Sequence, residues 1–568
     1  MQRLALRAAI LAVALPFLAA RAEDLGGQKE FRDLFFTLLQ QDNKMSPENA
    51  RKLLYALPQE LRSSSATSLD AIDALYRKHR PSELYTAGAK VPSASVNFVA
   101  DFKHGPVLLV VVPGVFGEFI AHSPFEEAFT NQNTAFAKQF HANLARLSGA
   151  DATDPVFSLA TMKFDEQPLT KVLDVTSIDD AHGKPLVKAV FLKPNFASLE
   201  TLGTLEENAA IYDRRLNKLF KVIGAQPFYL IGYSRGLTVA LELAAEKAKT
   251  HWGHNLKGVV SHAGVVYGTP LADASFQPGN PTYEMLQVLL PLLDKLHDHP
   301  PVLPDKPGFR DELHVAKIME EDWAAWAKAG LAIAHIEKNA PKADAGIALE
   351  KIKLALPGAR STFKLIKEFA WDQFKIIRKP ELTHLEKSQH FENVARFKAV
   401  VRKVYAGVTV LTTKSRVDWF KKHTLPADLT YYSIGATMAD QARPERANKP
   451  LFDAQGVCAL SHDPISTSAG SIDWTSLRPS YYQLADAGKG MELNDSQVPL
   501  QRVRFWPHLA RAINPAQHDF RSYFLGVLGA DHWGMSFPRA IDQHNHVNNP
   551  FPRATLLKAM GAFIASHP

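Results

Sequence analysis

Short apolar runs alternate with amphipathic segments along the first half of the chain. Helical periodicity separates the runs, as in ENAAIYDRRLNKLFKVI, which ends just before the third of them. The four clearest runs are VLLVVV at 107–112, VKAVFL at 187–192, FYLIGY at 228–233 and GVVSHAG at 258–264. Continuous apolar strands separated by helices are typical of a parallel sheet covered on both faces. The pattern therefore predicts an α/β fold whose core begins over residues 96–280.

The segments around this core have a different pattern. Residues 23–95 carry apolar positions three and four apart, as in FRDLFFTLLQQ and PENARKLLYALPQEL, and predict a helical N-terminal extension. Residues 281–403 also have helical periodicity without a convincing strand, and predict a helical insertion. Strand-like runs return over 404–568, in YAGVTVLTT, DLTYYSIGATM and SYFLGVLGA, and predict the second part of the core.

The first 22 residues, MQRLALRAAILAVALPFLAARA, have the pattern of a secretory signal peptide. Arg3 and Arg7 give a basic start, an apolar stretch runs from Ala8 to Ala20, and Ala22 ends a small-x-small cleavage site. The stretch is shorter than the roughly 20 residues that a membrane-spanning helix needs. We therefore expect export to the periplasm or the medium, with a buried N-terminal helix as the alternative. No cysteine follows the stretch, which disfavours a lipid-anchored lipoprotein.

The net charge bears on the class of binding partner, and the cysteine content bears on disulfide bonds. The net charge is +7, and it falls to +4 without the three arginines of the predicted leader. No basic block with interleaved aromatic residues stands out, so nucleic acid is not expected as a partner. Cys458 is the only cysteine, which excludes an intramolecular disulfide. At 568 residues and 46% hydrophobic, the chain can bury a core large enough to fold without one.

Ser234 is the first candidate for chemistry. It lies in PFYLIGYSRGLTVALELAA, between Gly232 and Gly236, where a strand pattern changes to a helix pattern. A serine in G-x-S-x-G at such a turn is a nucleophile elbow, in which a strained backbone projects the hydroxyl out of the sheet. Larger residues in place of the two glycines would collide with the neighbouring strand and helix. The alternative is a glycine-rich turn whose serine only caps the helix.

A serine nucleophile needs a histidine base and an acid that orients it, in the chain order serine, acid, histidine. His532, in GVLGADHWGMSFP, directly follows the last strand pattern, whereas His518, His544 and His546 have no preceding apolar strand. We therefore expect His532 to be the base.

Two aspartates are candidates for the acid that orients the histidine. Asp495 lies in ELNDSQVPLQRV after a long loop, and Asp440, in YYSIGATMAD, follows its strand more closely. Asp531 is adjacent to His532 in sequence, so its side chain is poorly placed to align that ring. A surface-loop aspartate is the alternative reading for both Asp495 and Asp440.

The developing oxyanion needs backbone N–H donors. One is expected from Arg235, the residue after the nucleophile. The second is expected from Val115 in VVVPGVFGEF, where an apolar strand ends in glycines that allow close approach of substrate. An ordinary turn at PGVFG is the alternative.

These motifs resemble the α/β-hydrolase superfamily, and within it the bacterial lipases and carboxylesterases. VPGVFG is similar to the oxyanion loop of lipases and of lecithin–cholesterol acyltransferase-like enzymes, with Pro113 where the bacterial lipase loop has histidine. GYSRG matches the elbow, and SHAGVVYGTPLAD resembles the lipase segment with a G-[ST]-P-x-A-D pattern. The resemblance is carried by scattered motifs over 107–568, without the helical insertion and the N-terminal segment.

The same resemblance bears on the acid. YYSIG followed by NDSQVP is similar to the lipase arrangement in which a tyrosine-rich strand precedes an N-D-G-x-V loop. It implies that Asp495 is the acid, although Ser496 stands where the family has glycine. The gap from Tyr432 to Asp495 is longer than expected, which leaves Asp440 open.

The resemblance implies an exported serine hydrolase of carboxylic esters with no organic cofactor. No ligand cluster in the sequence is strong enough to predict calcium. A lipid acyltransferase with the same triad, or a catalytically silent hydrolase fold that only binds, are the alternatives. The expected partners are an ester substrate and a lipid interface. The inserted helices would form a lid whose Trp323, Trp326 and Trp371 face acyl chains, or else a helical subdomain with these residues in its core.

Overall fold

The structure is a computed structural model that describes residues 27–47, 50, 53–62, 66–80, 83–84, 102, 105–115, 125–158, 163–195, 198–276, 402–437, 484–485, 491–532, 534–536 and 551–567. The predicted leader (1–22) lies outside these residues. So does the predicted insertion (281–403), with its three tryptophans, apart from its last two residues.

The centre of the fold is an eight-stranded mixed sheet with the strand order β1-β10-β9-β8-β7-β2-β6-β5. The six strands from β10 to β6 are parallel, and β1 and β5 pair antiparallel at the two edges. This sheet confirms the predicted α/β fold. Its strands are β1 (Leu54–Tyr55), β2 (Val107–Val112), β5 (Leu173–Asp179), β6 (Pro185–Leu192), β7 (Phe228–Tyr233), β8 (Leu256–His262), β9 (Thr430–Ala436) and β10 (Arg521–Leu528).

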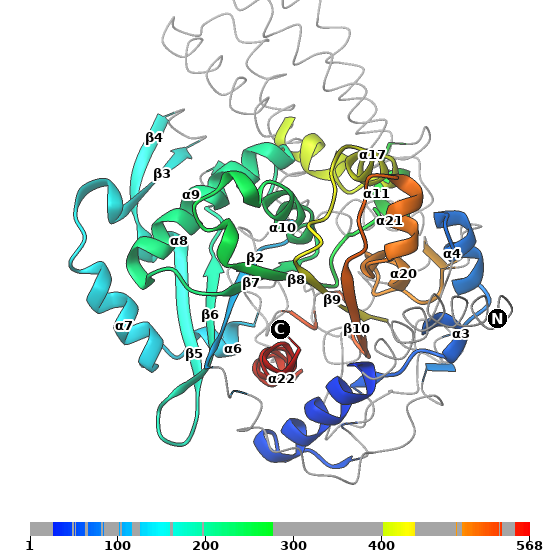
Figure 1. The fold of residues 1–568 in the computed structure, drawn as a ribbon, viewed down its shortest axis with the longest axis horizontal. Helices are drawn as coiled ribbons and strands as arrows, with labels where there is room; N and C mark the ends of the chain where they lie inside the picture. The colour runs from blue at the N-terminus through cyan, green and yellow to red at the C-terminus, as the bar shows by residue number, and fades with distance from the viewer. Residues whose placement is uncertain are drawn as a thin grey trace, which may run out of the picture.

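Helices cover both faces of the sheet, as Figure 1 shows. One face carries α9 (Leu205–Ile223) and α10 (Gly236–Ala245), and the other carries α22 (Arg553–Ser566) and a helix over residues 27–42. Successive side chains of a strand point to opposite faces. The apolar side chains of β2 accordingly divide between two buried clusters, one on each face of the sheet.

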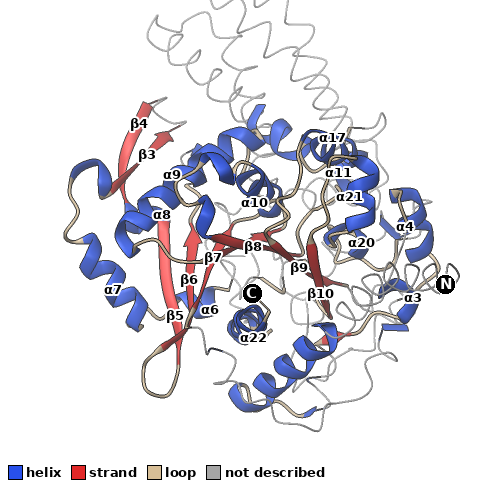
Figure 2. Cartoon of the chain, viewed as in Figure 1, coloured by secondary structure: helices blue, strands red, loops and turns tan. Residues whose placement is uncertain are grey.

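Shorter elements complete the described part of the chain. They are α3 (Gln59–Arg62), α4 (Leu69–Tyr76), α6 (Glu126–Phe129), α7 (Ala135–Leu144), β3 (Thr153–Ser158), β4 (Lys163–Pro168), α8 (Leu169–Val172), α11 (Pro270–Ala274), α17 (Thr413–Lys422), α20 (Leu500–Val503) and α21 (Pro507–Ile513). The hairpin of β3 and β4 forms a separate two-stranded sheet, seen beside the main sheet in Figure 2. Its buried Asp154 holds it to α9, because the carboxylate accepts hydrogen bonds from Arg214 Nε at 2.7 Å and Arg215 Nε at 2.9 Å.

The candidate site lies where the chain changes direction around β2. The chain runs from β2 to β6 on one side and then crosses to β7 on the other side. In parallel sheets, ligands bind beyond the carboxyl ends of the strands at such a change of direction. Val112 of β2 pairs with Gly232 of β7, so the loops that follow these two strands leave the sheet side by side.

Two local predictions differ from the structure. In PENARKLLYALPQEL, Leu54 and Tyr55 form strand β1 rather than helix, with Leu54 opposite Leu528 of β10. Here pairing with an open sheet edge outweighs helical periodicity.

The second difference concerns YAGVTVLTT, predicted as a strand. Residues 402–409 are helical, and a turn follows before α17. Leu411, with Val408 and Val410 beside it, packs in a small apolar cluster with Val265 and Val498. The strand propensity of the β-branched residues is therefore overridden by tertiary packing.

Candidate active site

Ser234 lies at the turn between β7 and α10, with a φ of 53°. This left-handed backbone is strained for a residue with a side chain. A Cβ on Gly232 would lie 2.2 Å from Leu237 Cα, and a Cβ on Gly236 would lie 2.3 Å from the Val112 carbonyl oxygen. Both glycines are therefore required by close backbone approach, one to the helix and the other to β2, as the motif led us to expect.

The structure brings Ser234, His532 and Asp495 together. Ser234 Oγ is 2.8 Å from His532 Nε2, and His532 Nδ1 is 2.7 Å from Asp495 Oδ2. The three side chains come from the turn after β7, the loop after β10 and the loop before α20. Their exposed fractions are 6%, 2% and 0% in that order, so the chain of hydrogen bonds is almost completely shielded from water.

The carboxylate of Asp495 is fixed by its own loop. Oδ1 accepts hydrogen bonds from the backbone N–H of Gln497 at 2.9 Å and of Val498 at 2.7 Å, which leaves Oδ2 directed at His532. The backbone N–H of His532 also donates to the Asp495 carbonyl oxygen at 2.8 Å. These bonds hold the acid and the ring in one relative orientation.

Of the other candidates, the structure describes only Asp531 and His518. Asp531 Oδ1 accepts a hydrogen bond from the Gly534 N–H at 2.7 Å and so turns into its own loop. His518 is exposed. Asp440, His544 and His546 lie outside the described residues.

Ser496, which stands where the resembling lipases have glycine, has a φ of 83° and is fully buried. Its backbone N–H donates to Asn494 Oδ1 at 2.8 Å, which stabilises the turn. Its hydroxyl oxygen has no hydrogen-bond partner in the described part of the chain. The position therefore carries backbone strain and an unsatisfied hydroxyl that glycine would not have.

We expect Ser496→Gly to raise the free energy of unfolding by about 1 kcal/mol, since relief of left-handed strain exceeds the added chain entropy. Urea denaturation monitored by tryptophan fluorescence would measure this. Ser496→Ala is the matched control, because it removes the hydroxyl and keeps Cβ at positive φ. A glycine variant no more stable than the alanine variant would show that φ carries no cost.

The loop after β2 passes directly over Ser234. A Cβ on Gly114 would lie 3.0 Å from Ser234 Cβ and 2.9 Å from the ring of Tyr233. Val115 follows in a turn and is half-buried, and its backbone N–H has no acceptor among the described residues. The loop is therefore close enough for Val115 to serve as the expected donor, a role that remains a prediction.

Arg235, the other expected donor, begins α10 with helical backbone angles. Its buried guanidinium donates to the carbonyl oxygens of Gly203 at 2.8 Å and Gly407 at 3.3 Å. The side chain thus points away from the reacting atoms and ties the elbow to two neighbouring loops, which leaves the backbone N–H as the group relevant to an oxyanion.

Two residues that sequence reasoning missed support the histidine loop. Tyr233 donates its hydroxyl hydrogen to the His532 carbonyl oxygen at 2.6 Å, and the two rings stack with centroids 5.2 Å apart. Burial, together with the charge of Asp495, raises the pKa of Tyr233 well above its usual range, so the phenol remains a donor.

His262, at the end of β8, is the second. Its Nε2 is 3.1 Å from Ser536 Oγ, within hydrogen-bonding distance, and Ser536 in turn accepts the Phe125 N–H through its carbonyl at 3.0 Å. Burial, with a smaller contribution from His532, lowers the pKa of His262 to about 3. Its ring therefore stays neutral at ordinary pH and holds the loop without carrying charge into the site.

We expect Tyr233→Phe to lower kcat roughly tenfold with little change in KM, because the His532 carbonyl loses its donor and the ring position loosens. Steady-state kinetics on a soluble ester would measure kcat and KM separately. Tyr431→Phe is the matched control, since Tyr431 is also buried and donates to a backbone carbonyl, that of Pro426. An equal loss of kcat in both variants would indicate general destabilisation instead of loss of positioning.

Neither a protein-family model nor a curated protein matches the chain. Two solved structures are similar at low identity. The crystal structure of the metagenomic carboxyl esterase MGS0156 is 14% identical, with 95% of this chain and 92% of that chain covered and a TM-score of 0.42. The Bacillus licheniformis lipase BlEst2 in its mature form is 11% identical, with 75% and 84% covered and a TM-score of 0.27.

The positions of the elbow and of two loops on the sheet identify the fold. The elbow follows β7 of the parallel sheet, and the glycine-containing loop after β2 lies against it. The histidine loop follows β10, the last strand of the sheet. The chain therefore has an α/β-hydrolase-like fold.

Proposed function

We propose that this chain is a carboxylic ester hydrolase of the lipase or carboxylesterase type, with Ser234 as nucleophile, His532 as base and Asp495 as acid. The observation that carries the proposal is the unbroken hydrogen-bond chain from Asp495 through both ring nitrogens of His532 to the hydroxyl at the elbow, at 2.7 Å and 2.8 Å. These are the distances at which a proton passes between heavy atoms.

In the first half of the proposed reaction, Ser234 Oγ attacks the ester carbonyl carbon while His532 Nε2 accepts the hydroxyl proton. Asp495 keeps the hydrogen on Nδ1, so that Nε2 presents a lone pair, and it stabilises the imidazolium that forms. The tetrahedral oxyanion would accept hydrogen bonds from the N–H groups of Val115 and Arg235. Collapse of the intermediate expels the alcohol, which takes the proton from His532.

In the second half, water attacks the acyl group on Ser234 and His532 again accepts a proton. The acid is released when the serine oxygen regains that proton. The cycle uses side chains and backbone groups of the chain throughout and needs no organic cofactor. Neutral His262 behind the loop supplies no competing base, because its pKa of about 3 is set by burial.

Hydrolysis of p-nitrophenyl butyrate tests the proposal, with release of nitrophenol and butyrate as the expected result. An acyltransferase would instead pass the acyl group to an added alcohol in preference to water, which product analysis would detect. A purified, folded protein that releases no nitrophenol and is not labelled by a fluorophosphonate would be a binding module, and the proposal would then be wrong.

We also propose that the enzyme is exported. The support is the leader pattern of residues 1–22, and sequencing the N-terminus of the exported protein, with Glu23 expected first, tests it. Within the described residues, no helix combines the length and apolar character needed to cross a bilayer.

A further inference from the structure

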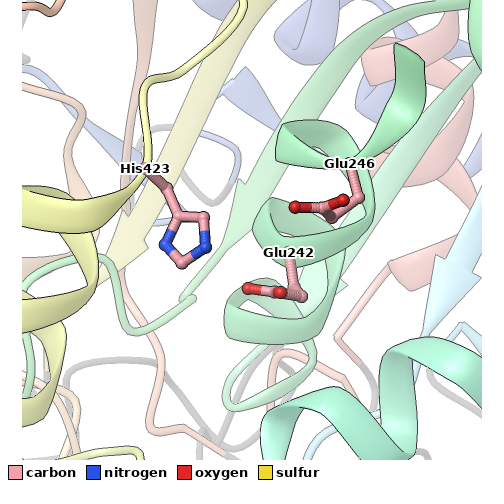
Figure 3. Close-up of side chains that lie close together, drawn as sticks. All are labelled: Glu242, Glu246 and His423. Carbon is pink, nitrogen blue, oxygen red and sulfur yellow. The ribbon is translucent and has the colours of Figure 1, made fainter. Parts of the chain in front are cut away.

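Three side chains of types that bind metals meet near the C-terminal end of α10, outside the candidate active site. Glu242 and Glu246 are four residues apart and so share one face of the helix. His423 follows the end of α17 and faces them. One carboxylate oxygen from each glutamate and one ring nitrogen all lie within 4.8 Å of one another. Figure 3 shows both carboxylates directed toward the imidazole ring.

The imidazole is held with one nitrogen available. His423 Nδ1 is 3.1 Å from the Trp419 carbonyl oxygen, and because a carbonyl only accepts, Nδ1 carries the hydrogen. The lone pair is then on Nε2. The ring also stacks on the Trp419 indole, with centroids 4.8 Å apart and an interplanar angle of 21°. Histidines that bind metals are commonly fixed in this way, by donation from the second nitrogen to a backbone carbonyl.

Glu242 is a buried carboxylate, with 8% of its surface exposed. Its Oε2 accepts a hydrogen bond from Trp419 Nε1 at 2.6 Å, which orients the group. Among the described residues, its other oxygen makes no hydrogen bond, and no cation lies within ion-pair distance of either oxygen. Buried carboxylates are normally paired with a cation or bound to a metal, since burial of an unpaired charge is costly.

The surrounding cations leave this charge without direct contact. The guanidinium of Arg416 lies 4.7 Å from the Trp419 ring centroid and donates to the Val266 carbonyl at 3.1 Å. Its charge attracts that of Glu242, but the two groups form neither a hydrogen bond nor an ion pair. Glu246 pairs with Lys249, whose side chain is 78% exposed. An exposed ion pair of this kind contributes little free energy, so a divalent cation could displace the ammonium.

We propose that Glu242, Glu246 and His423 bind a divalent transition-metal ion, with Zn²⁺ as the best match. One imidazole nitrogen and two carboxylate oxygens form a mixed set that suits zinc, whereas magnesium and calcium take oxygen ligands only. Zinc bonds of about 2.0–2.2 Å require the three ligand atoms to draw closer than they now lie. The partly exposed Glu246 and His423 can make this adjustment by side-chain rotation, and water would complete a tetrahedral site.

The bound ion would cross-link α10, the helix that follows the nucleophile, to the segment that follows α17. The simpler alternative is that His423 only caps α17, because its backbone N–H also donates to the Trp419 carbonyl at 3.0 Å. Under that alternative the three side chains would have no special affinity for metal.

Zinc binding to the untagged, chelator-treated protein tests the proposal. Isothermal titration calorimetry with ZnCl₂ is expected to show saturable binding of one zinc ion per chain. Zinc is expected to raise Tm relative to the protein in EDTA, whereas MgCl₂ is not. Glu246→Gln and His423→Gln should each weaken zinc affinity roughly 10- to 100-fold. Glu206→Gln and His254→Gln, at exposed positions on α9 and before β8, are the matched controls and should bind zinc as the wild type does.

Circular dichroism would establish that each variant is folded, which is expected because Glu246 and His423 are only partly buried. Unchanged zinc affinity in both Glu246→Gln and His423→Gln would overturn the proposal, as would the lack of any saturable equivalent in the wild type. Binding is read directly, so this result is independent of whether the chain hydrolyses esters.

Discussion

Replacing Ser234 with alanine is expected to leave a folded protein whose kcat for ester hydrolysis is lower by about 10⁴- to 10⁶-fold. The oxygen that attacks the substrate would be missing, and His532 Nε2 would face a methyl group in place of a hydroxyl 2.8 Å away. The fold should tolerate the change, since alanine keeps the Cβ that already sits at a φ of 53°.

A fluorophosphonate probe separates loss of the nucleophile from loss of the fold. The wild type should be labelled at Ser234, with the modified residue identified by peptide mass spectrometry, and Ser234→Ala should not be labelled. Ser275→Ala is the matched control, because Ser275 has the same exposed fraction of 6% and its hydroxyl donates to the Leu271 carbonyl. Equal labelling of the wild type and Ser234→Ala would show that another residue is the nucleophile.

The interior of the sheet was predictable from the sequence, and its edges were not. The strands β2, β7, β8 and β9 are buried along their whole length except at one residue of β8, so they appear in the sequence as continuous apolar runs. Strand β5, LDVTSID, is half polar, and β1 has only two residues. Strand β1 depends on pairing with β10, far along the chain, and β5 depends on antiparallel pairing with the adjacent β6. Periodicity within a short segment does not report either pairing.

Some residues of the candidate site were also predictable from local sequence pattern, and others were not. Ser234 and His532 follow strands that local pattern identifies, so their places at the carboxyl edge of the sheet could be expected. The contact of Tyr233 with His532 joins residues 299 positions apart, and no local signal marks it. Glu242 and Glu246 lie one helical turn apart, and His423 meets them only in the folded chain, where Trp419 of α17 donates to Glu242 of α10.

Replacing Asp495 with asparagine is expected to lower kcat by up to about 10⁴-fold with little effect on folding. The reason lies in the two backbone N–H groups, of Gln497 and Val498, that donate to Oδ1. An asparagine has one oxygen, and these two donors would hold it at the Oδ1 position. Its NH₂ would then face His532 Nδ1 and donate to it, which moves the ring hydrogen to Nε2. A protonated Nε2 cannot accept the proton of Ser234.

The rate of fluorophosphonate labelling and the comparison with Asp440→Asn make this expectation specific. Asp495→Asn should lose kcat at neutral pH and react with the fluorophosphonate correspondingly more slowly, because both reactions need the same unprotonated Nε2. Asp440→Asn should change kcat by less than about tenfold, since Asp495 already holds the hydrogen bond to His532 Nδ1 and a bystander carboxylate would act only through long-range electrostatics. The double variant Ser234→Ala/Asp495→Asn should be about as slow as Ser234→Ala alone, because the residues act as one unit. If Asp440→Asn is the crippling change and Asp495→Asn stays active, the carboxylate 2.7 Å from His532 is not the one that orients it during catalysis.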